Sequence, residues 1–156
     1  LIIGSGETKS RKRISDDIFS LLRVHPRIHV TGWVNNVQRH LAAADILVHP
    51  SYHEGMPNVL LQGAAMELPC IASNVRGNKD ALIDGETGFL FDPHDTKQLV
   101  YLLQRLIADD AMRHNMGKKG RAFMKSEFGR DVVCNRLRDF YFNLLYEGIA
   151  NENITY

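Results

Sequence analysis

Residues 49–73 read HPSYHEGMPNVLLQGAAMELPCIAS and hold the groups best suited to bind a ligand. Glu54 and Gly55 stand where a helix over 57–67 is predicted to begin. Pro57 suits the first helical position, because its missing N–H would be unpaired there anyway. The free N–H groups of a first helical turn carry about half a positive charge, so this end of the helix favours a phosphate.

Glu54 would repel a phosphate, so we interpret it as an acceptor for ligand hydroxyl groups. Gln62 lies about two turns further along the same helix, roughly 10 Å at 1.5 Å per residue. That spacing suits a nucleotide sugar, with hexose at one end, ribose at the other and the diphosphate between them. The simpler alternative also stands: Glu54 caps the helix and Gln62 faces solvent.

The rest of the sequence predicts a scaffold for these groups. Apolar runs at 1–3, 46–49, 69–73 and 89–91 and an alternating pattern at 27–31 predict strands. Helical periodicity predicts helices at 10–24, 37–43, 57–67, 79–83, 96–108, 111–126 and 131–146. Alternating strands and helices indicate an α/β fold, a Rossmann-like parallel sheet flanked by helices. Ligands of such sheets bind at the carboxyl ends of the strands. Segments 4–7, 32–35, 50–58 and 73–80 would meet there.

The composition is that of an ordinary globular domain, with 156 residues, 44% hydrophobic, 24% charged and a net charge of +1. This balance argues against a nucleic-acid partner. No apolar run is long enough for a membrane span, and no signal peptide is visible. Cys70 and Cys134 fit no metal or redox spacing, so we expect free thiols and a cytoplasmic location.

Three stretches together resemble a known family: LIIGSGE, then IHVTGWVNNV through HPSYHEGMPNVLLQGAAMELPCIAS, then VRGNKDALIDGETGFLFDPHD. They resemble the donor-binding C-terminal half of retaining, GT-B-fold glycosyltransferases of family 4. The resemblance covers residues 1–130 and is similar to the branch that builds bacterial capsular polysaccharide, exopolysaccharide and lipopolysaccharide. It implies a hexosyltransferase whose substrate is a nucleotide sugar, such as a UDP-sugar, with no metal or other cofactor.

The resemblance implies a role for each matching residue. Glu54 matches the first of two family glutamates and is expected to bind the hydroxyls of the donor sugar. Gly55 and Met56 match positions whose N–H groups approach the distal phosphate. The second glutamate falls on Gln62, expected to bind ribose; a neutral amide oxygen accepts a hydrogen bond less strongly than a carboxylate, so we expect weaker binding.

The other expected donor contacts come from several segments. Trp33 and Val34 match the loop that packs on the base, and Gly4 and Gly6 would line the floor of the cleft. Arg76 and Lys79 are cations that would partly neutralise the diphosphate or lie solvated at the surface, and His53 would touch the donor sugar or have a structural role. No catalytic residue is assigned; Glu54 is the nearest candidate. His49, His53 and Glu54 do not predict a metal site, because neighbours along a strand point to opposite faces.

The sequence also lacks two parts that the family has. The family's C-terminal half opens with one more strand and helix, which carry an Arg and a Lys for the diphosphate, and an N-terminal domain binds the acceptor. We therefore expect a fragment, with residues 131–156 as a C-terminal helix and tail, that is inactive alone. Any association with the inner face of the membrane would run through the missing half. Exposed strand edges favour self-association of the fragment.

Three other functions stay open. One is a nucleotide-sugar 2-epimerase or hydrolase of the same fold, and another is a non-catalytic binding or scaffold domain, favoured by Gln62. The third is a dinucleotide-binding oxidoreductase, which GSGETK disfavours because it lacks the third glycine of G-x-G-x-x-G. The sequence does not identify the sugar, the nucleotide or the acceptor.

Overall fold

The computed structural model describes residues 1–4 and 14–152, and only the backbone of residues 147–152. The chain forms two compact units, Leu1–Asp45 and Ile46–Tyr156. The predicted division at residue 130 coincides with the start of a helix rather than with this boundary, and as a division of function it stays a prediction. Gly6 and residues 10–13 of the first predicted helix lie outside the described residues.

The first unit holds two helices, α1 (Asp16–Val24) and α2 (Val37–Leu41). Ser15 caps α1, and the chain leaves the helix at His25, before Pro26, as the sequence predicts. The strands predicted at 1–3 and 27–31 are wrong. Only isolated bridges form, between Ile2 and Val30 and between Gly4 and Gly32. Both glycines have positive φ angles, of 131° and 69°, which turn the backbone away from an extended ladder.

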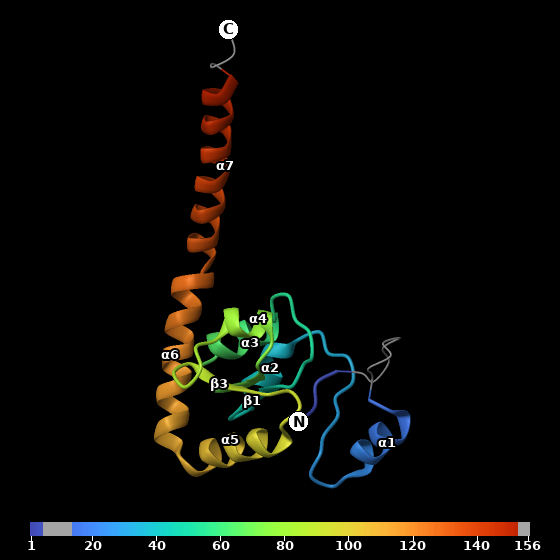
Figure 1. Ribbon diagram of the computed structural model, residues 1–156. Helices are drawn as coiled ribbons and strands as arrows, with labels where there is room; N and C mark the ends of the chain where they lie inside the picture. Colours follow the sequence, from blue (N-terminus) through green and yellow to red (C-terminus); the bar gives the residue numbers. More distant parts are fainter. Residues whose placement is uncertain (5–13, 153–156) are drawn as a thin grey trace. The chain divides into compact units, whose positions relative to one another are not determined.

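The second unit is built on a parallel sheet, which confirms the predicted α/β class. Its strands β1 (Leu47–His49), β2 (Cys70–Ser73) and β3 (Gly88–Phe91) lie in that spatial order. Val48 pairs with Ile71, and Ile71 pairs with Phe89. Helices α3 (Asn58–Ala65) and α4 (Arg76–Ala81) cover one face, and α5 (Thr96–Ala108) covers the other (Figure 1).

The central strand β2 divides the core into two parts, because its side chains alternate between the two faces. Ile71 joins a cluster with residues of β3, α5 and α6, namely Phe89, Phe91, Leu102, Leu106 and Met116. Cys70 and Ala72 face the opposite way and join Leu60, Ala81 and Leu82. All four residues of β2 are buried, as expected for the middle strand of a parallel sheet covered on both faces.

Helix α3 ends in a tight turn that fixes its approach to α6 (Asp110–Phe128). Leu68 N–H donates to Gly63 O and Glu67 N–H donates to Ala64 O, both at 3.0 Å, which is the Schellman arrangement. Glu67 occupies the left-handed position with φ 60°, where glycine is usual. Gly117 of α6 lies directly against the Glu67 backbone and has no room for a Cβ. The backbones of α3 and α6 are therefore in direct contact at this point.

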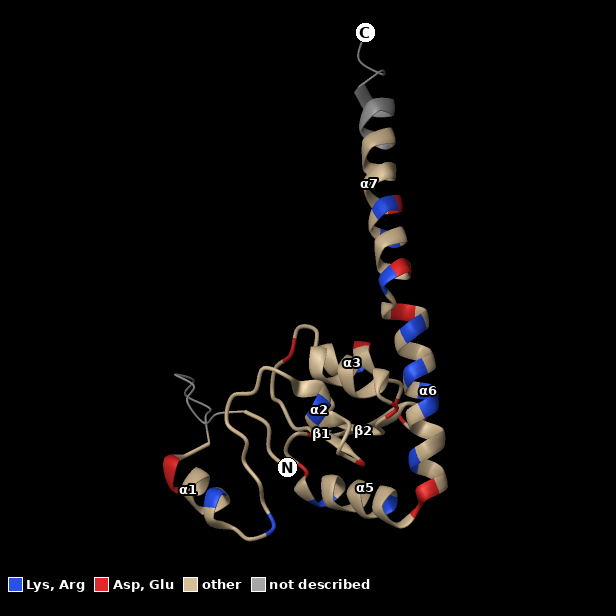
Figure 2. Ribbon diagram, turned by 180° about the vertical axis from the view of Figure 1, so that it is seen from behind, with Lys and Arg blue, Asp and Glu red and all other residues tan. Residues whose placement is uncertain are grey.

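Helix α7 (Arg130–Glu152) follows α6 after a break at Gly129 and extends away from the sheet (Figure 1). Lys and Arg recur along α6 and the first part of α7 (Figure 2). Four aromatic side chains on this helix are exposed: Phe140, Tyr141, Phe142 and Tyr146. Among the described residues, no helix combines the length and the apolar character needed to cross a membrane.

The predicted element bounds shift by a few residues elsewhere. The helix predicted at 57–67 is shorter, and Pro57 is its N-cap rather than its first residue. The helical turn predicted at 79–83 lies earlier, at Arg76–Ala81, because Val75 O already accepts from Lys79 N–H. Leu82 is extended, so the helix cannot continue to residue 83.

Candidate functional site

The predicted ligand-binding segment of the second unit follows β1 directly and lies beside the carboxyl end of β2. Ser73 ends β2, is fully buried, and its Oγ donates to His49 O and Ser51 O. Asn78 of α4 is also fully buried, and its Nδ2 donates to Ser73 O at 2.8 Å. These contacts hold the start of the 50–57 loop against β2 and α4. The backbone at the start of this loop is therefore held in place by β2 and α4.

Glu54 is held by a side chain from the neighbouring strand. Its Oε1 lies 2.9 Å from Nε2 of His49, the last residue of β1. The two side chains are 25% and 22% exposed, so the pair is partly shielded from water yet reachable. This carboxylate accepts a hydrogen bond at Oε1, and among the described residues its second oxygen accepts none. That suits hydrogen bonds from hydroxyl groups better than binding of an anion.

The backbone of the same loop rests on α4. A Cβ added at Gly77 would lie 2.7 Å from Glu54 O and would overlap Gly55 O. Only glycine permits this approach. The absence of a side chain at Gly77 therefore lets the backbone of Glu54 and Gly55 pack directly on α4.

Helix α3 presents free N–H groups next to this carboxylate. Pro57 is its N-cap and has no side-chain cap bond. Within the described part of the chain, the N–H groups of Gly55, Met56, Asn58 and Val59 donate no hydrogen bond. Gly55 and Met56 are exposed, and a Cβ at Gly55 would meet nothing within 4 Å. Unpaired donors at an open helix N-terminus are a suitable environment for a phosphate group.

Gln62 lies on the side of α3 away from the core. Leu60 is 1% exposed, and two residues at about 100° per residue place Gln62 roughly on the opposite side of the helix. It nevertheless is half-buried. Asn58, one turn earlier, shares its face and is exposed. Gln62 is thus placed to meet a ligand that begins at the helix N-terminus.

The two predicted cations are close to the loop in sequence and structure. Arg76 and Lys79 both belong to α4, are exposed, and form no ion pair among the described residues. Arg76 directly precedes Gly77, the residue in contact with the Glu54–Gly55 backbone. His53 is exposed on the same loop, and the ring of its neighbour Tyr52 packs against His94 beyond β3 at 5.7 Å.

The remaining predicted residues belong to the first unit. Trp33 is 83% exposed, and its Nε1 donates to Asn35 Oδ1 at 3.3 Å. Val34 is half-buried, and Gly4 N–H donates to Gly32 O at 3.0 Å. Their role in binding a nucleotide stays a prediction.

Three residues of the site were given no binding or structural role from the sequence: His49, and Ser73 and Asn78 within the predicted segment 73–80. His49 was considered only as a metal ligand. The signal available was its position as the last residue of an apolar strand, five residues before an acid. Among the described residues, no three His, Cys, Asp or Glu side chains are grouped to hold a metal ion; metal independence of the reaction stays a prediction.

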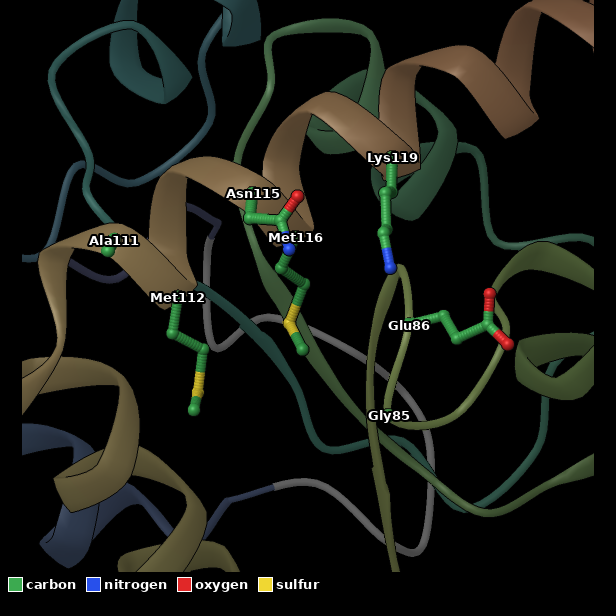
Figure 3. Close-up of a pocket in the computed structure, with 7 residues that line it drawn as sticks. All are labelled: Gly85, Glu86, Ala111, Met112, Asn115, Met116 and Lys119. Carbon is green, nitrogen blue, oxygen red and sulfur yellow. The ribbon is translucent and has the colours of Figure 1, made fainter.

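A hollow of about 430 Å³ lies elsewhere, between the 84–88 turn and α6 (Figure 3). Lys119 of α6 reaches toward the turn that carries Gly85 and Glu86, and the side chains of Met112 and Met116 point from the same side of α6. It contains none of the predicted site residues. Its lining offers a mixed apolar and charged surface without a buried polar group, so the loop after β1 stays the better candidate.

Comparison with known proteins identifies relatives. Residues 1–109 match the family model described as glycosyl transferases group 1. CapM of Staphylococcus aureus, a capsular polysaccharide biosynthesis glycosyltransferase, is 31% identical over 94% of this chain and 38% of its own length. The Escherichia coli UDP-Gal:alpha-D-GlcNAc-diphosphoundecaprenol alpha-1,3-galactosyltransferase is 28% identical over 93% of this chain and 37% of its own.

Among solved structures, sucrose-phosphate synthase from Thermosynechococcus elongatus is similar with a TM-score of 0.76 and 29% identity, over 83% of this chain and 34% of that protein. The chain spans about two fifths of the length of the curated relatives it matches. The family match extends over more than half of the chain and includes every predicted donor-binding residue. The chain therefore belongs to the group 1 glycosyl transferases.

Proposed function

We propose that this chain is the nucleotide-sugar-binding half of a retaining hexosyltransferase that works in bacterial polysaccharide synthesis. The observation that carries the proposal is the juxtaposition of a held carboxylate, Glu54, with the free N–H groups at the start of α3. The carboxylate accepts hydrogen bonds from sugar hydroxyls, and the N–H groups donate hydrogen bonds to a phosphate. The names of the S. aureus and E. coli relatives support polysaccharide synthesis and a UDP-sugar donor.

The arrangement suggests how the donor lies. The sugar meets Glu54, the distal phosphate meets the N–H groups of Gly55 and Met56, and the ribose meets Gln62. As the bond between sugar and diphosphate breaks, negative charge grows on the leaving phosphate. Free N–H groups and the exposed cations Arg76 and Lys79 would stabilise that charge where it develops.

The acceptor would be bound by a further domain of the full-length protein, and transfer with net retention needs both parts. No step in this proposal uses a metal or other cofactor. A cytoplasmic location is part of the proposal, since Cys70 and Cys134 are both free thiols.

The proposal is tested by calorimetric titration of the chain with UDP, GDP and their common sugar conjugates. We expect one nucleotide series to bind. Gln62→Glu should raise the affinity for that nucleotide, because a carboxylate accepts hydrogen bonds from hydroxyl groups more strongly than an amide oxygen does. Gln62→Ala should weaken it. Wild-type chain that binds no member of the panel up to millimolar concentration would contradict the proposal and favour a non-catalytic scaffold domain.

A further inference from the structure

His49 is positioned by the sheet and not by the loop. It is the last residue of β1 and pairs with Ala72 of the central strand. Ser73 Oγ donates to its carbonyl oxygen at 3.4 Å. The backbone of His49 is therefore fixed by neighbours in β2, while Glu54 follows in a loop without regular structure.

The contact between the two side chains has a defined direction. An ionised carboxylate only accepts hydrogen bonds, so Nε2–H of His49 donates to Oε1 of Glu54 at 2.9 Å. In the described part of the chain, Oε2 of Glu54 accepts no hydrogen bond. One oxygen is thus occupied by the protein, and the other is available to a ligand.

We propose that His49 is a positioning residue for donor-sugar recognition: it holds one oxygen of Glu54 and aims the other at a sugar hydroxyl. The inference rests on the proposed function, because it assigns His49 to the same site. A free glutamate side chain samples many rotamers, and ordering it on binding costs affinity. Because His49 orders the Glu54 side chain in the free protein, donor binding does not have to supply the free energy of ordering it.

This role predicts a selective loss. His49→Leu introduces an apolar side chain of similar bulk and removes the donor, and it should lower the affinity for a UDP-sugar about tenfold, which corresponds to about 1.4 kcal/mol. Free UDP does not reach Glu54 in the proposed pose, so its affinity should stay within about twofold. His49→Gln carries an N–H donor at similar reach and should restore most of the affinity for the sugar conjugate.

The experiment compares UDP and UDP-sugar titrations of the wild-type chain, His49→Leu, His49→Gln and a control, His114→Leu. His114 is exposed on α6, outside the site, so its variant should match wild type. Equal losses for UDP and UDP-sugar in His49→Leu, or no rescue by glutamine, would overturn the positioning role. Wild-type chain that binds no nucleotide sugar would overturn the proposed function and this inference together.

A second measurement needs no ligand. In a ¹⁵N-detected imidazole NMR spectrum of the free chain, the Nε2 resonance of His49 should shift on Glu54→Gln, and that of His114 should not. An unchanged His49 resonance would show that the contact does not form, and would overturn the inference even if the wild-type chain binds a nucleotide sugar.

Discussion

Gly77 offers the clearest way to move Glu54 without touching its side chain. A Cβ at Gly77 would lie 2.7 Å from Glu54 O, which is 0.7 Å short of the 3.4 Å at which ordinary contacts begin. In Gly77→Ala the loop must retreat by at least that distance. The His49–Glu54 hydrogen bond is 2.9 Å long, so a displacement of this size away from His49 would take it beyond the range of a real hydrogen bond.

Two effects set the stability of this variant. Crowding against backbone costs about 1–3 kcal/mol, and the helical preference of alanine returns up to about 1 kcal/mol. We expect a net loss of about 1–2 kcal/mol in the free energy of unfolding. We also expect about a tenfold loss of affinity for a UDP-sugar, since about 1.4 kcal/mol of interaction is removed.

Gly117→Ala is the matched control. Its Cβ would lie 2.6 Å from the carbonyl carbon of Glu67, so it meets backbone in the same way, but at the α3–α6 contact and not at the loop. Urea unfolding should show a similar loss for both variants, and calorimetry should show weaker sugar binding only for Gly77→Ala. If the two variants bind a UDP-sugar equally well, the packing of α4 does not position Glu54, and the reasoning is refuted.

Three other parts of the chain give further predictions. Glu67→Gly should raise the free energy of unfolding by about 1 kcal/mol in urea melts, because glycine adopts φ 60° without strain. Burial raises the pKa of the Cys70 thiol to about 12, so iodoacetamide should label exposed Cys134 at pH 8 and reach Cys70 only on unfolding. Only the unfolded chain releases that thiol proton above pH 9, so stability should fall as the pH rises from about 9 towards 12. Leu137 and Leu144 are each 52% exposed on one side of α7, and exposed apolar side chains favour association between copies of the chain. Sedimentation should therefore detect self-association of the wild-type chain. Replacing both leucines by glutamate should abolish it.

The second unit could be predicted well because its signals are strong and local. The helix at 96–108 follows Asp95, a residue type that favours N-caps, and the Asp95 side chain accepts from Gln98 N–H at 2.9 Å. The apolar runs at 46–49 and 69–73 became neighbouring parallel strands; both are short and followed by a helix, the first half-buried and the second fully buried. The fold class and the carboxyl-end location of the segments in this unit follow from that pattern.

The predictions that were wrong depended on contacts distant in sequence. The runs at 1–3 and 27–31 have strand character, yet two glycines with positive φ interrupt their pairing. The His49–Glu54 contact depends on how the loop turns back toward β1, which alternation along a strand does not describe. Gly77 looks like any helix glycine until the backbone opposite it is known.

The central claim is that Glu54 recognises the sugar while the start of α3 binds the diphosphate. The most direct test is calorimetric titration of wild type and Glu54→Ala with UDP and with the UDP-sugar that binds best. We expect Glu54→Ala to lower the affinity for the sugar conjugate at least tenfold and to leave the affinity for UDP unchanged. Equal weakening of both ligands, or of neither, would contradict it.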